Sequence, residues 1–421
     1  MALEVVEICA GAGGQVLGLH RAGFTHRFAF ELDPNACRTL RANSERLSVS
    51  REDWVREGDV ADPDLWNPKE FKGIDLLAGG VPCPPFTIAG KQLGATDERD
   101  LFAWAVEQVG VVKPKALMLE NVRGLSMPRF AGYRQHVLDR LREFGYAAEW
   151  RLLHASDFGV PQLRPRFVLV AMKPEDFAYF HWPEREDKPA LTVGEALREM
   201  LGANGWKGAD AWAKNANDIA PTIVGGSKKH GGADLGPTRA KRAWAAMGVD
   251  ALGVADAAPS PGQKFPVGPK LTADMVARLQ GWDNGEFAWT FTGLKTSKYR
   301  QIGNAFPPPV AKALGVAIKA ALERSAEPKA RDIDSAHDPI YRALRDSGDF
   351  MTHAQIQRKV KTAIEAHELD RRISMLRQDF DIEMRNGKSE PAYKLLQFKA
   401  FLGQEDHSRH DKFQKSRTTI S

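Results

Sequence analysis

The sequence predicts a doubly wound α/β fold, joined to a smaller loop-rich domain and a C-terminal unit. Over the first 170 residues, short apolar runs alternate with helical stretches, the pattern of parallel strands linked by crossover helices. After about residue 174, tryptophan and glycine become frequent and no strand or helix period persists. The predicted domains are 1–173 plus 296–325, 174–295 and 338–421, with a charged, proline-containing linker at 326–337.

Four strand-like runs are expected to end at one edge of the sheet. They are Leu3–Cys9, Arg27–Phe30, Ile74–Ala78 and Ala116–Leu119. The segments that follow them are, in order, Gly11-Ala12-Gly13-Gly14, Glu31, a loop that holds Cys83, and Glu120. Because ligands of open α/β sheets bind outside the carboxyl ends of the strands, we expect an active site at this edge.

A further pair of strands is predicted in EWRLLHASDFGVPQLRPRFVLVAM. Two apolar runs flank a loop, and Gln162, Arg164 and Arg166 fall at the start of the second run. The helix expected after Pro309 can pack back on the first domain, because QIGNAFPPPVAKALGVAIKAAL reads as a loop followed by an apolar helix.

The composition is typical of a globular protein. The formal net charge of +5 and the pI of about 8.9 suit a polyanionic partner but also many ordinary enzymes. The sequence shows no apolar run of about 18 residues and no charged-then-apolar leader, so we expect a soluble intracellular protein.

Cys83 lies between prolines in GGVPCPPFTIAG, which favours a stiff loop that presents its thiol. The three cysteines, at 9, 37 and 83, form no metal-ligand spacing, so neither a disulfide framework nor structural zinc is expected. An unpaired cysteine is usually a small buried hydrophobe, and we assign that role to Cys9 and Cys37. A reactive Cys83 needs an acid or base nearby, and Glu120 is the expected neighbour. A buried carboxyl group can stay protonated and donate that proton.

The glycines after the first strand favour a nucleoside ligand. The dinucleotide fingerprint G-x-G-x-x-G is not completed, since its last position is Val16. A tight glycine turn without the phosphate pattern suits S-adenosylmethionine, with Glu31 placed for the ribose hydroxyls and Asp59 for the adenine amino group. The alternative for each acidic residue is an ordinary surface turn.

The C-terminal unit is predicted to hold three helices and a hairpin. Asp338-Pro339 starts the first helix, Gly348 can end it and Thr352 can cap the second. The third is indicated by apolar residues at helical spacing: Leu369, Ile373, Leu376 and Phe380. RNGK at 385–388 predicts the hairpin turn, and the whole suggests a winged helix-turn-helix. Its charges nearly balance, which leaves DNA binding and docking of a partner protein equally open.

Seven motifs together resemble the DNA (cytosine-5) methyltransferases of bacterial restriction-modification systems. In that family's order they are EICAGAGG, FELD, DLLAGGVPCPPFTIAG, LENVRGL, QLRPR, RLQGW and QIGNAFPPPVA, and they lie between residues 4 and 318. The family usually has Phe where this chain has Cys9, which leaves contact with adenine to other apolar neighbours. The unit beyond 326 lies outside the resemblance.

The resemblance implies a Rossmann-like domain that binds S-adenosylmethionine and a covalent mechanism. Cys83 would add to C6 of cytosine, Glu120 would act at N3, and the activated C5 would take the methyl group. Arg166 and Arg164 would contact the cytosine ring oxygen and support the site. No metal is implied. The implied cofactor-binding residues are Cys9, Gly11, Gly13, Gly14, Glu31, Leu32, Asp59, Val60, Pro82 and Asn304.

The resemblance also implies a target-recognition domain within 174–295 that grips double-stranded DNA while the base is swung out of the helix. Candidates for contacts to phosphate or guanine are Lys228, Lys229, His230, Arg239, Lys241 and Arg242. A solvated basic loop is the alternative for any one of them. We expect a cytoplasmic bacterial enzyme that acts as a monomer on DNA, with a C-terminal unit able to dock another partner. The sequence leaves two settings open: protection of DNA from a cognate restriction endonuclease, or a solitary enzyme that marks DNA for another purpose.

Three other functions were considered. An RNA (tRNA) cytosine-5 methyltransferase shares these motifs but typically has a shorter recognition region. A catalytically idle binding protein is disfavoured by the presence of Cys83, Glu120 and Arg166. A nicotinamide oxidoreductase is disfavoured by the glycine spacing.

Overall fold

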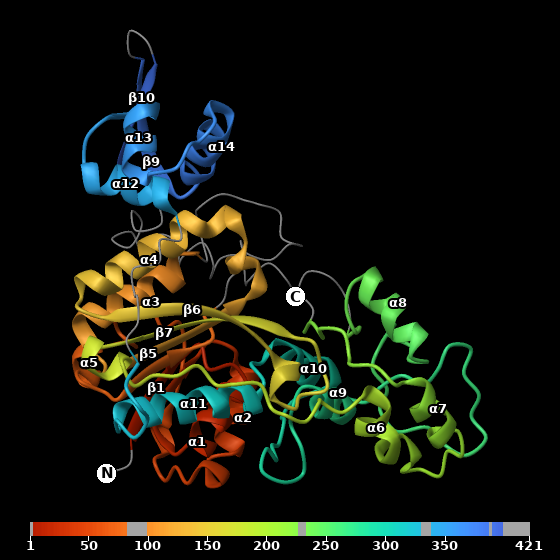
Figure 1. Ribbon diagram of the computed structural model, residues 1–421. Helices are drawn as coiled ribbons and strands as arrows, with labels where there is room; N and C mark the ends of the chain where they lie inside the picture. Colours follow the sequence, from red (N-terminus) through yellow and green to blue (C-terminus); the bar gives the residue numbers. More distant parts are fainter. Residues whose placement is uncertain (1–2, 82–98, 226–232, 330–337, 387–389, 399–421) are drawn as a thin grey trace. The chain divides into compact units, whose positions relative to one another are not determined.

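The computed structural model describes residues 3–81, 99–225, 233–329, 338–386 and 390–398 (Figure 1). By the density of its contacts the chain forms two compact units. The first comprises Met1–Gly80, Pro114–Glu120 and Trp150–Ala330. The second comprises Val81–Lys113, Asn121–Glu149 and Arg331–Ser421. The predicted domain boundaries stay a prediction.

The fold is mixed α/β and is built on a seven-stranded sheet of order β3-β2-β1-β4-β5-β7-β6. The pairs β1–β2, β2–β3, β1–β4 and β4–β5 are parallel. The four predicted strands are therefore confirmed, and their carboxyl ends lie at one edge. The strands are β1 (Leu3–Ile8), β2 (Phe24–Glu31), β3 (Val55–Glu57), β4 (Leu76–Gly79), β5 (Ala116–Val122), β6 (Ala147–His154) and β7 (Pro165–Met172).

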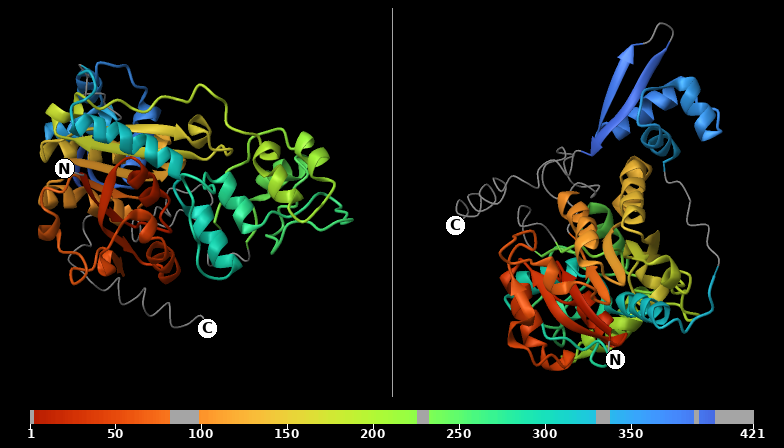
Figure 2. Two further views of the ribbon diagram at one scale, coloured as in Figure 1. Left: turned by 90° about the horizontal axis from the view of Figure 1, so that it is seen from below. Right: turned by 90° about the vertical axis from the view of Figure 1, so that its left-hand side faces the viewer.

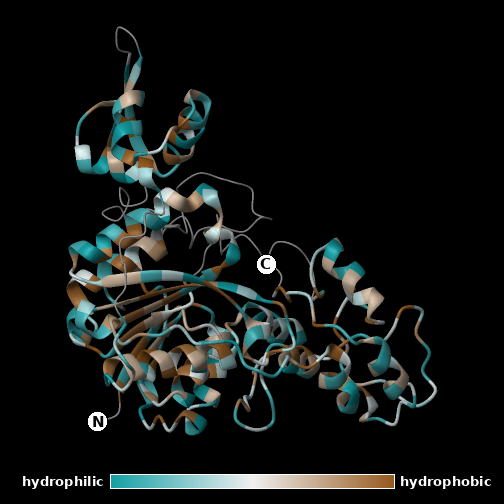
Figure 3. Ribbon diagram, viewed as in Figure 1, coloured by the Kyte–Doolittle hydropathy of each residue, from teal (hydrophilic) through white to brown (hydrophobic). Residues whose placement is uncertain are grey.

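The chain reverses its direction of travel across the sheet at β1, which has β2 on one side and β4 on the other. Such a switch point leaves a crevice outside the strand ends in open α/β sheets. The middle strands are buried, and they are largely brown in the hydropathy colouring of Figure 3. The residues that follow these strands are thus held on a rigid base.

Eleven labelled α-helices precede the C-terminal unit in the described residues. They are α1 (Gly14–Arg21), α2 (Pro34–Ala42), α3 (Arg99–Val112), α4 (Ala131–Glu143), α5 (Pro174–Phe177), α6 (Val193–Gly202), α7 (Ala209–Asn215), α8 (Thr238–Ala246), α9 (Ala273–Leu279), α10 (Lys295–Asn304) and α11 (Pro308–Leu322).

The helix predicted after Pro309 is α11, and it packs on α1 as Figures 1 and 2 show. It starts with proline at the first helical position, where no backbone N–H is needed. Its buried face carries Val310, Leu314 and Ile318. The two helices approach closely at Gly18, where a Cβ would lie only 2.4 Å from that of Ala311. This contact packs the last helix of the predicted catalytic domain against its first helix.

The stretch 174–295 shares a hydrophobic core with the N-terminal part of the sheet. One buried cluster runs from Val16 and Leu40 to Trp212, Trp244 and Tyr299. The indole N–H of Trp212 donates to the Gly248 carbonyl at 2.7 Å, and that of Trp244 donates to the Leu235 carbonyl at 3.2 Å. The frequent tryptophans therefore fill a core where regular secondary structure is sparse.

The C-terminal unit has the order helix, strand, two helices and hairpin, with a three-stranded sheet of order β8-β10-β9. The cap at Asp338 and the ends at Gly348 and Thr352 are as predicted: Asp338 accepts two backbone N–H bonds and Thr352 forms a capping box. The elements are α12 (Pro339–Ser347), β8 (Met351–Thr352), α13 (His353–Val360), α14 (Ala366–Leu376), β9 (Phe380–Asn386) and β10 (Pro391–Phe398).

One part of the helix prediction is wrong. Leu369, Ile373 and Leu376 are buried on α14 as expected, but the helix ends at Leu376 and Phe380 begins β9. Phe380 is nevertheless buried, so the spacing identified a core residue and missed the change of element. Arg385 and Asn386 lie in β9, and the remaining two residues of the predicted turn, 387–388, lie outside the described residues.

His136 of α4 is buried among aromatic rings of the C-terminal unit. Its ring stacks on Phe398 at 4.4 Å and meets Tyr341 and Phe380 edge-on. Its Nδ1 lies 2.9 Å from the Tyr341 hydroxyl. Burial, with help from Arg345 and Arg140, lowers the pKa of His136 to about 3. The folded protein therefore holds this imidazole neutral.

This neutral imidazole predicts a loss of stability in acid. An unfolded chain protonates the histidine below a pKa of 6.5, while the folded chain resists protonation until about pH 3. The stabilisation is complete above pH 6.5 and declines as the pH falls, by about 1.4 kcal/mol per pH unit at most. Urea unfolding between pH 7 and 5 should show a shallower decline for His136→Phe than for the wild type. Equal slopes would contradict the assignment.

Candidate active site

The glycine turn after β1 is closed on both sides by bulky neighbours. Gly11 and Gly13 have φ values of +55° and +92°, a region that favours glycine. A Cβ on Gly13 would lie 2.5 Å from the Trp289 ring, and one on Gly14 would lie 2.1 Å from the Phe306 carbonyl oxygen. The Trp289 indole also donates to the Ala12 carbonyl at 2.8 Å. A side chain does not fit at positions 13 and 14, and this leaves the backbone of the turn close to any ligand at the sheet edge.

Glu31 ties this turn to the end of β2. One carboxylate oxygen accepts the Gly11 N–H and the other accepts the Asp33 N–H, each at 2.7 Å. Burial raises the pKa of the Glu31 carboxyl, and these backbone hydrogen bonds oppose the shift. A carboxylate offers about four lone-pair sites, so acceptor capacity remains for a sugar hydroxyl pair.

Three of the other predicted cofactor residues, Leu32, Asp59 and Val60, follow β2 or β3 in the chain. Asp59 follows β3, is half-buried and accepts the Ala61 N–H at 2.9 Å. Val60 is buried and Leu32 is exposed. Asn304 ends α10, and its side-chain oxygen is so close to Gly225 that a Cβ there would lie 2.3 Å away. Pro82 lies outside the described residues.

Cys9 and Cys37 have the surroundings of structural cysteines. Burial and the carboxylates of Glu31 and Asp59 raise the pKa of the Cys9 thiol well above its usual value. Burial, with Glu31 next in size, raises the pKa of Cys37 to about 12. Neither cysteine forms a thiolate readily near neutral pH, which supports the packing roles assigned to them.

Glu120 and Arg166 form a buried ion pair near the end of β5. The predicted end of this strand at Leu119 is wrong, since β5 continues through Glu120 to Val122. Arg166 Nε lies 2.5 Å from Glu120 Oε1, and both residues are mostly shielded from solvent. Burial raises the pKa of the Glu120 carboxyl although Arg166 and Arg164 lower it. Gly80 is next to this carboxyl, since a Cβ built on it would lie 3.4 Å from Glu120 Oε2. Cys83 follows three residues later, outside the described residues.

Arg164 is buried deeper and binds three backbone carbonyls. Its Nη1 donates to Ile223 at 2.7 Å, and its Nη2 donates to Gly303 at 2.8 Å and Ala305 at 2.7 Å. The residue is 1% exposed. Through these bonds Arg164 joins the segment before β7 to the chain around Ile223 and to the end of α10. The role that the resemblance gave to its motif stays a prediction.

Two glutamines complete the junction around Arg164. The Gln162 carbonyl accepts the Ile223 N–H at 2.9 Å, and its amide donates to Gln280 at 2.5 Å. The Gln280 amide donates in turn to the Ala305 carbonyl at 2.9 Å. Sequence reasoning missed the contacts that Gln280 and Ile223 make with Gln162 and Arg164. The only available signal for Gln280 was its place within RLQGW.

The described candidates for DNA contact lie on or near α8. Arg239 and Arg242 are exposed and three residues apart, so they share one side of the helix. Lys241 instead pairs with Asp234 at 2.7 Å. Lys228, Lys229 and His230 lie outside the described residues.

The chain from residue 3 to 320 matches the family model of the C-5 cytosine-specific DNA methylases. The chain belongs to this family. It is 67% identical over 419 residues to the Type II methyltransferase M.NaeI of Lentzea aerocolonigenes, covering 100% of this chain and 99% of that protein. It is 48% identical to M.NgoMIV of Neisseria gonorrhoeae over 328 residues, which cover 77% of this chain and 99% of that protein.

Solved structures show the same fold as this methylase. A putative DNA modification methyltransferase encoded within a prophage (E. coli) aligns with a TM-score of 0.50 at 22% identity, covering 76% of this chain and all of that one. The Entamoeba histolytica methyltransferase EhMeth aligns with a TM-score of 0.51 at 15% identity, covering 76% and 99%. At these identities the likeness concerns the fold alone.

The family establishes the reaction of this methylase: it transfers a methyl group to C5 of cytosine in DNA, with S-adenosylmethionine as the donor that the family implies. Within the described residues, no helix is long and apolar enough to cross a membrane. That part of the chain also holds no group of three or more His, Cys, Asp and Glu residues placed to bind a metal ion.

Replacing Glu31 tests the cofactor end of the site. Glu31→Gln keeps the shape of the side chain but removes its charge and one of its two acceptor oxygens. Charge-assisted hydrogen bonds contribute about 1.5–3 kcal/mol, so we expect affinity for S-adenosylmethionine to fall about 10- to 100-fold by isothermal titration. Glu57→Gln, at the end of β3, is the matched control and should bind normally. Equal affinities for both variants would show that Glu31 does not hold the cofactor.

Proposed function

We propose that Cys83 and Glu120 are the catalytic residues of this methylase and that Arg166 orients Glu120. The observation that supports this most is the buried Glu120–Arg166 pair, in which burial raises the pKa of the carboxyl. A carboxyl with a raised pKa is a competent proton donor near neutral pH. The Arg166 guanidinium, with Nε 2.5 Å from Glu120 Oε1, fixes the position of this carboxyl.

The thiolate of Cys83 adds to C6 of the cytosine while Glu120 donates a proton to N3. This addition makes C5 nucleophilic, which it is not in the free base, and so divides one difficult step into easier ones. S-adenosylmethionine, when bound, would supply the methyl group to C5 and leave as S-adenosylhomocysteine. Loss of the C5 proton and elimination of the Cys83 thiolate then release 5-methylcytosine, and N3 returns its proton.

The cofactor would be held by the turn at Gly11, Gly13 and Gly14, by Glu31 and Asp59, and by the chain around Asn304. Two features of the structure fit this group. The glycine turn brings the backbone to the sheet edge, and the Glu31 carboxylate has acceptor capacity left for ribose hydroxyls. Leu32, Val60 and Pro82 are the proposed apolar neighbours of the base, in place of the aromatic residue that Cys9 replaces. No metal takes part in this scheme.

The stretch 174–295 is proposed as the target-recognition domain, which grips double-stranded DNA while one cytosine leaves the stack. Arg239 and Arg242 on α8 are placed for phosphate or guanine contacts, and Lys228, Lys229 and His230 are retained as candidates. Lys241 is the weakest of them, because Asp234 already neutralises it. The RNA alternative is set aside, since the matching family model is one of DNA methylases.

We further propose that the enzyme acts as a monomer in the bacterial cytoplasm and protects DNA from a cognate restriction endonuclease. The support is similarity to M.NaeI and M.NgoMIV, both Type II methyltransferases. The C-terminal unit is proposed to be a winged helix-turn-helix. Its element order and its sheet order β8-β10-β9 support that assignment.

The reaction and its nucleophile are tested together by bisulfite sequencing. A plasmid is recovered from a methylation-free bacterium that expresses either the wild type or Cys83→Ser. We expect cytosines at one short sequence to be protected by the wild type and none by the variant, because a serine hydroxyl is a much weaker nucleophile than a thiolate. Protection of cytosines by the Cys83→Ser variant would rule out Cys83 as the nucleophile.

Replacing the proposed proton donor tests Glu120. Positioned acid–base groups typically contribute about 10²- to 10⁴-fold, so Glu120→Gln should lower kcat by that factor in a tritiated-methyl transfer assay. Affinity for S-adenosylmethionine should be unchanged. Glu7→Gln is the control. It alters a buried carboxyl of β1 that pairs with His26 of β2, and it should keep kcat within a few-fold of the wild type. Similar kcat values for the two variants would exclude a specific role for Glu120.

A further inference from the structure

One side of α4 is covered by the C-terminal unit. The contacting residues recur every three or four positions, the spacing of a single helix side. From the turn before the helix to its last residue they are Arg129, Gly132, His136, Asp139 and Glu143. This docking side, named here the α4 seat, is contacted by residues from α12, the end of α14 and both hairpin strands.

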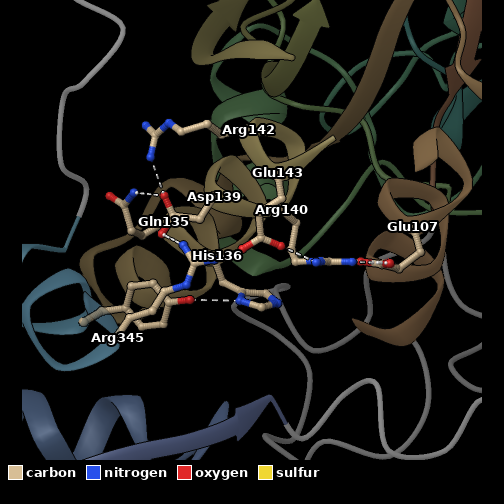
Figure 4. A network of polar contacts seen from close by, with 9 residues as sticks. Glu107, Gln135, His136, Asp139, Arg140, Arg142, Glu143 and Arg345 are labelled. Carbon is tan, nitrogen blue, oxygen red and sulfur yellow. Dashed lines mark hydrogen bonds and ion pairs between the residues drawn. The ribbon is translucent and has the colours of Figure 1, made fainter. Parts of the chain in front are cut away.

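Charged pairs form at both ends of the α4 seat. At the C-terminal end, Arg345 of α12 lies 2.7 Å from Asp139 and also pairs with Glu143, as Figure 4 shows. At the other end, Arg129 pairs at 3.0 Å with Asp379, which directly precedes β9. Asp139 is 2% exposed and Asp379 is 3% exposed. Removing one partner of such a buried pair leaves an uncompensated charge, so these contacts are more than incidental surface pairs.

The α4 seat is also connected to other residues of α4 and to α3. Asp139 accepts from Gln135 at 3.1 Å and from Arg142 at 2.9 Å. The neighbouring Arg140 pairs with Glu107 of α3 at 2.7 Å. Figure 4 shows these side chains as one continuous polar network that runs from α12 through α4 to α3. These contacts therefore link α12 to both α4 and α3.

Between the charged ends the contact is apolar and tight. A Cβ on Gly132 would lie 2.3 Å from Leu376 Cδ2 of α14, so a larger residue would force the Leu376 side chain to move. Next to it, the buried His136 ring packs against Tyr341, Phe380 and Phe398 as described above. Complementary shape together with paired buried charges is the property of a built interface.

The same helix fixes the segment that follows Glu120. Arg134, on α4, donates to the carbonyls of Leu125 at 2.7 Å and Met127 at 2.9 Å. Burial lowers the pKa of Arg134 to about 10, and Asp338 of the C-terminal unit opposes this shift by attraction. At the start of the segment, the Asn121 amide donates at 3.4 Å to the carbonyl of Val81, which precedes Cys83 by two residues in the chain.

We propose that the C-terminal unit is an intramolecular brace that positions residues 121–130 for catalysis by holding the α4 seat. Arg345 and Asp379 are its positioning residues. The link to catalysis rests on the proposed roles of Glu120 and Cys83. The family model ends at residue 320, so the brace is an addition to the common methylase chain. It acts on the turnover rate rather than on affinity for DNA.

The test compares Arg345→Ala and Asp379→Asn with the wild type in the full-length chain. Arg358→Ala is the control, because this exposed cation of α13 forms no ion pair among the described residues. Hydrogen exchange of peptides that cover 121–130 should be faster in both brace variants and unchanged in the control. Small displacements of catalytic groups are costly, so kcat should fall on the order of 10- to 100-fold while KM for target DNA stays within about twofold.

A double-mutant cycle identifies the pair itself. If Arg345 acts through Asp139, adding Asp139→Asn to Arg345→Ala should lower kcat much less than Asp139→Asn does in the wild type. Additive effects would overturn that assignment. A raised KM for DNA with unchanged kcat would overturn the brace and favour DNA binding by the C-terminal unit.

The exchange measurement separates this proposal from the one on which it rests. Faster exchange in 121–130 with kcat unchanged would keep the contact and refute its catalytic role. Unchanged exchange in both variants, with the C-terminal unit still protected, would refute the brace whatever the outcome for Glu120→Gln. Asp379→Asn preserves side-chain size, so it remains informative where Arg345→Ala fails to fold.

Discussion

The rest of the site depends on one buried cation. Arg164 places its guanidinium among the carbonyls of Ile223, Gly303 and Ala305, which belong to segments far apart in the sequence. A buried charge is costly unless it is well solvated by the protein, and three carbonyl dipoles supply that solvation. The fold therefore favours the arrangement in which the strand β7, the stretch 174–295 and the end of α10 meet. Arg166, two residues later, then reaches Glu120.

This arrangement gives the two arginines of one motif different tasks. Arg164 has its Nη atoms directed at backbone, so it builds the junction. Arg166 lies beside the carboxyl group whose raised pKa suits proton donation. A lysine could replace neither one, because a single ammonium cannot present the planar set of donors that the carbonyls and the carboxylate use.

Local features of the chain were predictable from the sequence because they follow from local physics. The strands, the glycine turn, the caps at Asp338 and Thr352 and the buried positions Leu369, Ile373 and Leu376 were all legible as short patterns. Phe380 was misplaced because a helix period continues by chance across a change of element. The spacing predicted the burial of Phe380 correctly but not its secondary structure.

Long-range contacts were not predictable. Gln280 and Ile223 gain their roles from partners more than 50 residues away, and no period in the chain encodes such a pairing. The α4 seat looks like an ordinary charged helix surface until Arg345 and Asp379 are placed against it. The shared core of Val16, Trp212 and Trp244 was likewise hidden, because irregular chain around tryptophans has no characteristic spacing.

The most direct test of this account is to titrate the Arg164→Lys variant with S-adenosylmethionine and, separately, with target DNA. If Arg164 joins the proposed cofactor-binding residues to the proposed recognition stretch 174–295, the affinities for both ligands should fall together. The circular dichroism spectrum should stay native-like. A variant that is folded and binds both ligands as tightly as the wild type would contradict the account.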